Sequence, residues 1–373
     1  MAETILASAS EKQIWVTNYL KEYVRASGLL PYMSTRQNAI IRIRRELAQT
    51  AGTAINVPLI GRLKGSGVTG SQVLDGNEED LENLNDRVQV DWIRNGVVVP
   101  KSTSFRTEID LLNAAREALV DWSAEKLRDD ALAQMGAIVI PGAADANGIP
   151  GTDTTVSFAA ASAAQRNTYL VNNTDRILFG SARANSSSGV WATAAATVDN
   201  TADKMSTGVI SLAKRMARTP GNTQRKITPY RTEDGREYYV MFVGSLQMRD
   251  LKADTAMQAA NREARPREVG SNPIFQDGDL LWDGVIIREI PELPIIASGT
   301  AGAGIDIQQA FLCGQSALCV AFGQDPTPRT DNSRDYGFRP GVAIEELRGL
   351  KKVSYGGQNY GMVTVITAAV GDA

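Results

Sequence analysis

The spacing of hydrophobic and polar positions changes several times along the chain, and each change marks a predicted element. Residues 11–49 carry apolar positions at near-helical intervals and are predicted to form helical pieces of an arm. The apolar positions of this arm include Ile14, Trp15, Tyr19 and Tyr23. The arm has too few apolar residues for a core of its own, so we expect it to pack on another surface.

Residues 53–64 and 88–99 are rich in β-branched residues and are predicted to be two extended strands. The segment between them is polar, with a glycine-rich half followed by an acidic half. Two strands joined by such a tip predict a protruding hairpin. Because a two-stranded ribbon is marginal by itself, the hairpin must lie on a neighbour, within the subunit or in another copy.

Residues 104–135 show the strongest helical pattern, with apolar positions at three- and four-residue steps and Gly136 at the end. The stripe comprises Leu112, Ala115, Leu119, Trp122, Leu127, Ala131 and Met135. It predicts a long strut whose Trp122 face packs on the β body of its own subunit.

The remaining two thirds of the chain predict a mixed α+β body. Residues 140–203 are rich in small polar residues and are predicted to be short strands joined by long ordered loops. Helices are predicted at 203–219 and 245–264, and strands at 226–245, 278–290, 305–323 and 339–370. Turn dipeptides mark two of the strand pairs, at Asp234-Gly235 and Asp283-Gly284.

Composition indicates a folded, multi-part subunit. The 373 residues are 43% hydrophobic and 22% charged, and no apolar run approaches the ~20 residues that span a bilayer. The first residues lack the pattern of a signal peptide, so we expect the protein to stay in the cytoplasm. A net charge of −3 argues against a dedicated duplex-DNA binder. Cys313 and Cys319 are predicted to be reduced core residues.

The chain contains no histidine. This absence excludes Ser-His-Asp and Cys-His catalysis and disfavours most zinc sites. Enzymes built on carboxylates, lysine or magnesium stay open, but the prediction is a non-enzyme without a cofactor. Gly65–Gly70 matches G-x-G-x-x-G without the following helix that a dinucleotide site requires, and no phosphate-binding P-loop motif occurs.

Two groups of charged residues are candidate contact sites between subunits. The basic group is Arg36, Arg42, Arg44 and Arg45. It suits either nucleic-acid contact or ion pairing with a neighbour. The acidic group is Glu78, Glu79, Asp80 and Glu82. It is interpreted as a solvated face, or as the partner of a basic patch on a neighbouring subunit, rather than a cation site. Lys64, near the hairpin tip, completes the candidates.

Six blocks of the chain carry a family resemblance. They are GTAINVPLIGRLKGSGVTG (52–70), VQVDWIRNGV (88–97), RTEIDLLNAAREALVDWSAEKL (106–127), TDRILFG (174–180), YYVMFVGSLQMRDLKAD (238–254) and NPIFQDGDLLWDGVIIREIPELP (272–294). In this order they resemble the major capsid proteins of tailed bacteriophages with the Hong Kong 97-type fold, most closely the phage N-four-like subgroup. At Gly244-Ser245 the chain differs from the sequence that is commoner in the family, and this difference affects the expected packing at that point.

The resemblance implies an α+β capsid fold with five consecutive parts. They are an N-terminal arm (1–52), an extended E-loop hairpin (53–100), a peripheral domain (101–200) with spine helix 104–135, an axial domain (201–335), and a C-terminal β segment (336–373) that returns to the peripheral domain. The implied function is self-assembly, through hexamers and pentamers, into the icosahedral head shell around double-stranded DNA. The protein would reside in the virion capsid after assembly in the bacterial cytoplasm.

The implied partners are other copies of the chain, a portal protein and, in weak contact, the packaged DNA. A separate scaffolding protein is expected, because about fifty residues before the hairpin are few for a scaffolding domain. Lys64 and Asn359 occupy positions like those of one lineage's lysine–asparagine crosslink, but no crosslink is expected. Two alternatives stay open: another virion part, such as a decoration or portal protein, and a carboxylate-dependent hydrolase without histidine.

Overall fold

The computed structural model describes residues 28–48, 52–63, 65–79, 81–106, 110–144, 150–221, 225–231, 235–263 and 280–372. The predicted helical arm residues before residue 28 lie outside this part of the chain. Two compact units are present. The first contains residues 92–127 and 324–347, and the second contains 28–91, 128–323 and 348–372. Each unit therefore combines segments that are far apart in the sequence.

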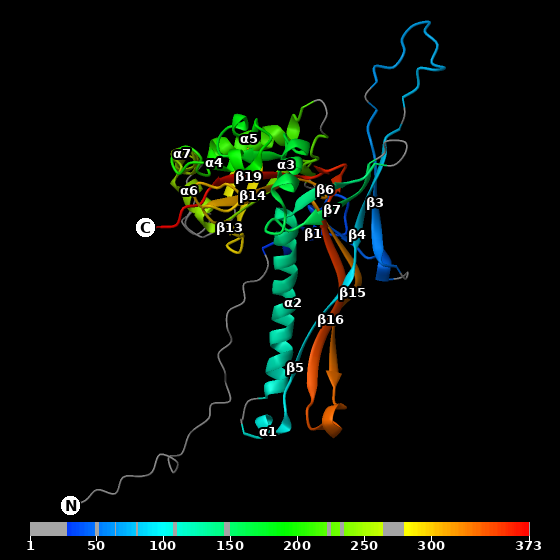
Figure 1. The fold of residues 1–373 in the computed structure, drawn as a ribbon, viewed down its shortest axis with the longest axis vertical. Helices are drawn as coiled ribbons and strands as arrows, with labels where there is room; N and C mark the ends of the chain where they lie inside the picture. The colour runs from blue at the N-terminus through cyan, green and yellow to red at the C-terminus, as the bar shows by residue number, and fades with distance from the viewer. Residues whose placement is uncertain are drawn as a thin grey trace, which may run out of the picture. The chain divides into compact units, whose positions relative to one another are not determined.

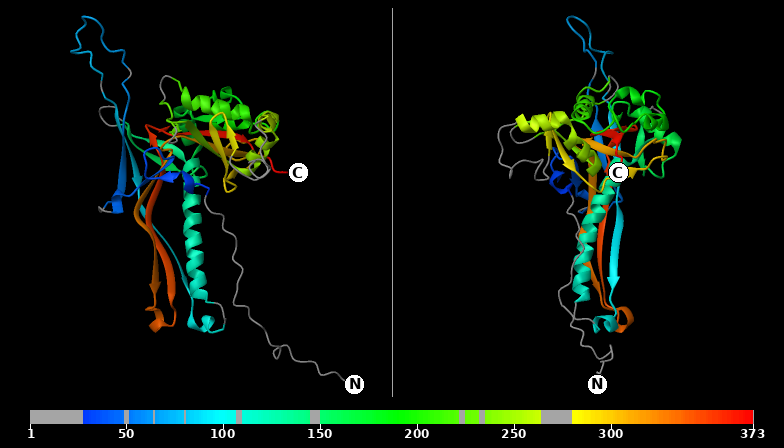
Figure 2. Two further views of the ribbon diagram at one scale, coloured as in Figure 1. Left: turned by 180° about the vertical axis from the view of Figure 1, so that it is seen from behind. Right: turned by 90° about the vertical axis from the view of Figure 1, so that its left-hand side faces the viewer.

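In the first unit a helix runs alongside strand segments (Figures 1 and 2). The elements that contribute to it are β5 (Asp91–Val98), α1 (Lys101–Ser104), α2 (Leu111–Gly136), β15 (Leu318–Asp331), η6 (Arg334–Gly337) and β16 (Gly341–Lys352). The α2 stripe packs on Val342 and Ile344 of β16. The members of this stripe are Leu112, Ala115, Leu119 and Trp122. The prediction that the Trp122 face packs on a strand of its own subunit is confirmed.

The second unit contains an eight-stranded mixed sheet with strand order β11-β12-β10-β14-β19-β8, with β9 paired to β10 and β13 to β14. Its strands are β8 (Ile177–Phe179), β9 (Tyr230–Arg231), β10 (Glu237–Val243), β11 (Leu280–Trp282), β12 (Val285–Glu289), β13 (Ile295–Ile296), β14 (Ile307–Cys313) and β19 (Met362–Ala368). The central β14–β19 pair is antiparallel over its whole length. Between β11 and β12, Asp283 and Gly284 have φ of 46° and 69°, which confirms the predicted tight turn.

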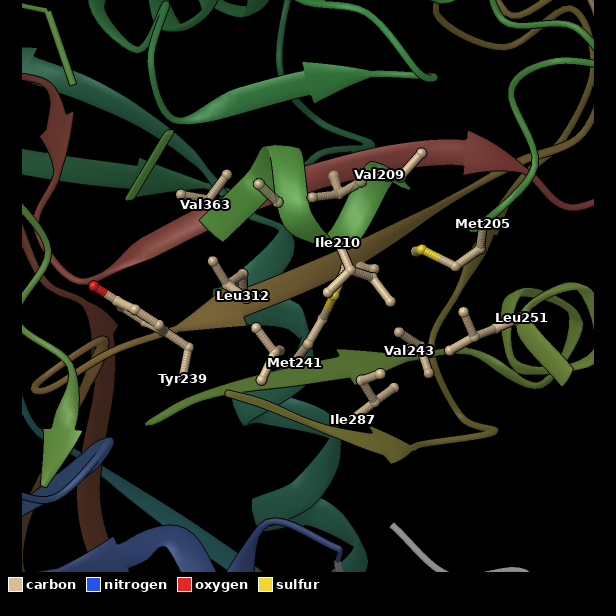
Figure 3. Packing of buried hydrophobic residues seen from close by; sticks show 14 of the residues in the cluster. Met205, Val209, Ile210, Tyr239, Met241, Val243, Leu251, Ile287, Leu312 and Val363 are labelled. Atoms are coloured by element: carbon tan, nitrogen blue, oxygen red, sulfur yellow. The ribbon is translucent and has the colours of Figure 1, made fainter. Parts of the chain in front are cut away.

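Helix α5 (Thr207–Arg218) covers one face of this sheet. It realises the amphipathic helix predicted at 203–219, with Ser206 as its N-cap. Met241 and Val243 of β10 and Leu312 of β14 point toward Ile210 of this helix (Figure 3). Helices α6 (Ser245–Ala253) and α7 (Thr255–Glu263) add Met248, Leu251 and Met257 to the same core.

The opposite face of the sheet packs on the C-terminal end of α2. Alternate β10 residues, Val240 and Phe242, lie in a second core with Leu132 and Met135 of the helix. Since successive strand residues point to opposite faces, β10 contributes to both cores and reads as a continuous apolar run.

A third core lies at the β8 edge of the sheet. It joins β6 (Ile138–Gly142), α3 (Ala163–Asn172) and α4 (Trp191–Ala196). Next to it along the chain are β7 (Gly151–Val156), the antiparallel partner of β6, and η4 (Arg183–Ser186). The Trp191 ring packs edge-on against Phe179 at 5.1 Å.

Five predictions about single elements need correction. Residues 41–44, expected to be helical, form β2 (Ile41–Arg44), parallel to β15 and followed by η3 (Glu46–Ala48). The region 140–203 contains α3 and α4 besides strands, and a capping box of Ser162 and Gln165 begins α3. Helix α2 begins at Leu111, and the predicted helix at 245–264 is two helices that meet at Asp254.

The fifth correction concerns the predicted hairpin. Its strands are β3 (Ala54–Ile60) and β4 (Asn83–Gln89). The residues after Val90 form β5, which instead pairs with β16 in a five-stranded sheet of order β1-β2-β15-β16-β5. The remaining elements of the described residues are η2 (Leu30–Tyr32), β1 (Met33–Ser34), β17 (Ser354–Tyr355) and β18 (Gln358–Asn359).

Candidate assembly surfaces

The β3–β4 hairpin has a buried root and an exposed tip. Its strands pair from Ala54↔Gln89 to Ile60↔Asn83. Ile55, Val57, Leu84 and Val88 are buried at the root in a core shared with Val353 and Tyr355. Beyond Ile60 the side chains of Leu63, Val73, Leu74 and Leu81 are exposed. A root held by a core and a tip without one are properties of an element that reaches outward.

A buried ion pair fixes the root. Asp86, on the buried face of β4, contacts the Nζ of Lys351 on β16, and neither side chain is appreciably exposed. Lys351 also donates to the main-chain oxygens of Asp153 (2.6 Å) and Arg87 (3.2 Å). Burial raises the pKa of the Asp86 carboxyl, while the Lys351 ammonium counteracts this shift. With every ammonium proton bonded, the pair is of the kind that a protein interior tolerates.

Two further contacts hold the root from the C-terminal β segment. The Tyr355 hydroxyl donates to the Val57 carbonyl at 3.0 Å, and burial raises the pKa of Tyr355, which keeps the hydroxyl a donor. The Ser354 N–H donates to Asp86 at 3.2 Å. The sequence reasoning missed these residues, although Asp86 could have been found as a lone charge on the apolar face of an alternating strand.

The acidic candidates lie along the second limb of the tip. Glu78 accepts from the Gly76 N–H at 2.7 Å, and Glu79 accepts from the Gly65 N–H across the hairpin. Glu82, nearer the root, accepts from the Arg225 guanidinium at 2.7 Å. Lys64 and Asp80 lie outside the described residues. The structure therefore brings three of the acidic candidates to one hairpin limb, and Glu82 forms an ion pair with Arg225 of its own subunit.

The basic candidates lie on and beside β2. Arg42 and Arg44 alternate on one side of the strand, opposite Cys319 and Ala321 of β15. Arg44 pairs with Glu46 at 2.9 Å. Arg45 stacks over the Phe322 ring at 5.6 Å, and Arg36 is exposed in the turn before β2. The four arginines therefore lie on a strand and next to it, and not on one face of a helix.

Other sequence candidates lie away from the hairpin tip. Asn359 is buried, and its amide donates to the Tyr169 hydroxyl at 2.8 Å. Both cysteines are free and buried, as predicted, and burial raises the pKa of Cys319 to about 11. The G-x-G-x-x-G segment is an exposed loop in which Gly67 and Gly70 both have a φ of 66°.

Within the described ranges, no three carboxylate or thiol side chains gather where they could hold a metal ion. None of the helices that the structure describes is long and apolar enough to cross a membrane. In the first unit, Phe105 and Tyr336 are also almost fully exposed. The exposed apolar side chains at the hairpin tip and at Phe105 and Tyr336 are candidate contact surfaces, of the kind that subunits of an assembly use.

Comparison with known proteins agrees with this class. The family described as phage capsid protein matches residues 3–371, and the chain belongs to this family. It is 38% identical to a chain of the cyanophage Pam1 capsid asymmetric unit, with a TM-score of 0.88 and full coverage of both chains. It is 25% identical to the major capsid protein of Pseudomonas phage KPP25, over 96% of this chain and 95% of that protein.

The capsid of Ralstonia phage GP4 contains the same fold, with a TM-score of 0.72 at 24% identity and full coverage of both chains. The mixed helix-and-sheet structure is accordingly a phage capsid fold. The protein is a structural major capsid protein that forms the shell of a phage head, and the prediction of function and of location in the virion capsid is confirmed.

Proposed function

We propose that the subunit builds its shell in the Hong Kong 97-type manner, with the β3–β4 hairpin serving as the E-loop that ties neighbouring copies together. The observation that carries the proposal is the contrast along one hairpin. Asp86 and Tyr355 fix its root inside the subunit, whereas Val73 and Leu74 at its tip are 67% and 56% exposed. Apolar side chains held away from any core of their own need a partner surface.

The finer organisation follows the same architecture. Hexamers and pentamers of the chain form the shell through the axial domain (201–335). The peripheral domain (101–200), with the residues of the predicted spine helix 104–135, and the C-terminal segment (336–373) support the hairpin. The N-terminal arm (1–52) remains on the mature particle, against its inner surface. Scaffolding is supplied by a separate protein, and a portal protein occupies one vertex.

The charged candidates would act between subunits. Arg36 and Arg45, exposed beside β2, suit a neighbour's carboxylates or the phosphates of packaged double-stranded DNA. Glu78 and Glu79 suit a neighbour's basic surface. A net charge of −3 supports only weak DNA contact by the shell as a whole.

Shortening the hairpin tests the tie. Residues 65–79 are replaced by an Asn-Gly turn, which closes the two limbs where Gly65 and Glu79 face each other. The soluble subunit should keep its unfolding midpoint, because the tip contributes nothing to the root core, but closed shells should be absent in electron micrographs. Shells of normal yield and size from this variant would show that the hairpin is not an assembly element.

A further inference from the structure

A groove of about 460 Å³ lies at the root of the hairpin, between the end of β3, residues 225–228 and the β17–β18 turn. Its floor is apolar and includes Leu84, Tyr355 and Tyr360. The two tyrosine rings pack edge to face at 5.6 Å, and the hydrogen bond from Tyr355 to Val57 holds the floor in place. The groove is therefore preformed, and binding into it does not require its floor to be ordered first.

The rim of the groove is basic. Arg62, Arg225 and Lys226 line it, against the single carboxylate of Glu82, which Arg225 already binds. Arg62 and Lys226 are exposed, and neither makes an ion pair or a side-chain hydrogen bond with another described residue. The rim thus presents two uncompensated cations above an apolar floor, which suits an extended peptide that combines carboxylates with apolar side chains.

The hairpin tip has this composition. The sequence from Gln72 to Glu82 contains five acidic residues and no basic one, and Val73, Leu74 and Leu81 stand among them. Asp75, Glu78 and Glu79 are exposed. Within its own subunit the hydrogen bond from the Gly65 N–H to Glu79 keeps the two limbs together beyond Ile60, and Val73 and Leu74 lie further out along the hairpin, away from the groove. A second copy of the chain can supply it.

We propose that the root groove of one subunit receives the tip of the next subunit's hairpin, with residues 73–79 over the apolar floor and Glu78 and Glu79 against Arg62 and Lys226. This inference rests on the proposed function of the hairpin as an intersubunit tie, and it assigns the receiving surface. Groove and tip are different surfaces of the same chain, so the contact is heterologous and repeats around a ring of subunits.

A charge exchange tests the contact. Lys226→Glu alone and Glu78→Lys alone should each lower the yield of closed shells about tenfold or more, because each places like charges together. The double variant should recover most of the yield, since the attraction is restored with reversed sign. Ser187→Glu, at an exposed position outside the groove, should assemble normally. Single reversals that assemble like the parent protein would overturn the proposal.

A disulfide trap identifies the partner surface directly. Cys313 and Cys319 are buried, so cysteines introduced by Glu78→Cys and Lys226→Cys are the reactive ones. Oxidised particles of the double variant should give a ladder of covalent multimers on a non-reducing gel. The pairing of Glu78→Cys with Ser187→Cys should give none.

The two proposals fail differently. If the shortened hairpin blocks assembly while the charge exchange has no effect and the trap gives no ladder, the tie stands and the groove is not its receiver. If the shortened hairpin assembles normally, the tie fails, and the groove assignment fails with it.

Discussion

At the scale of single residues, the position of the hairpin root depends on Gly349. A Cβ at this position of β16 would lie 1.8 Å from the carbonyl oxygen of Gln89, at the end of β4. No side chain fits there unless the two segments separate. Gly349→Ala should therefore destabilise the subunit by about 1–3 kcal/mol or more, measured as a lower midpoint of denaturant unfolding. Gly304→Ala is the matched control, because an added Cβ there meets no atom within 4 Å. Equal midpoints for the two variants would contradict the close approach.

Lys352 is a buried cation whose ammonium bonds to uncharged oxygens. Its side chain is 1% exposed, and its Nζ donates to the carbonyls of Met135 (3.2 Å) and Ala137 (2.5 Å) and to the Tyr169 hydroxyl (3.0 Å). It thus satisfies oxygens at the C-terminus of α2, where a cation is favoured. Lys352→Met should lower the free energy of unfolding by about 2–4 kcal/mol, because it leaves buried acceptors unpaired. Lys226→Met, at an exposed lysine, should stay within about 0.5 kcal/mol in the same thermal unfolding experiment. A similar small loss for Lys352→Met would mean that water replaces the ammonium.

At the scale of elements, the α2 stripe is the part of the fold that the sequence specifies most directly. Trp122 is partly buried against β16, while Val120, two residues earlier, is 62% exposed on the other side of the helix. Trp122→Ala should therefore lower the free energy of unfolding by about 2 kcal/mol, less than the ~3–5 kcal/mol expected for a fully buried ring. Val120→Ala should change the free energy of unfolding by no more than about 0.5 kcal/mol. Chemical unfolding of both variants measures the difference. An unchanged unfolding midpoint for Trp122→Ala would mean that the apolar stripe of α2 stabilises contacts between subunits and not the fold of the single subunit.

The predictions succeeded where a local pattern decides the structure and failed where distant segments decide it. The period of α2, the Asp283-Gly284 turn and strand β3 are local and were predicted from the sequence, whereas residues 83–87 of β4 were assigned to the polar tip of the hairpin. Residues 41–44 were misread because they become a strand by pairing in parallel with β15, almost 280 residues later. Ile41, Arg42, Ile43 and Arg44 do alternate with period two, but the surrounding helical spacing outweighed that signal.

The assembly surface was predictable in part. Composition marked the hairpin tip, because glycines and acids between two β-rich runs indicate an exposed turn. Arg225 and Lys351 were not predictable as its supports, since both lie more than 100 residues from the hairpin in sequence. Their partners Glu82 and Asp86 become neighbours only through the tertiary fold.

At the scale of the whole molecule, function depends on surfaces that the folded subunit leaves for other copies, and assembly is a matter of contact free energy. The chain has no histidine and belongs to a capsid family. A shell subunit is held in its particle by many repeated contacts with other subunits. Purified subunits, with whatever scaffolding protein the particle requires, should therefore assemble without nucleotide and in the presence of a chelator. The yield should fall as salt is raised if charged tips and grooves contribute, because exposed ion pairs are screened. Light scattering follows the assembly and electron microscopy counts the closed shells. A strict requirement for ATP or for a divalent cation would show that binding energy between subunits is insufficient, and that a chemical step or a metal-filled interface drives this shell.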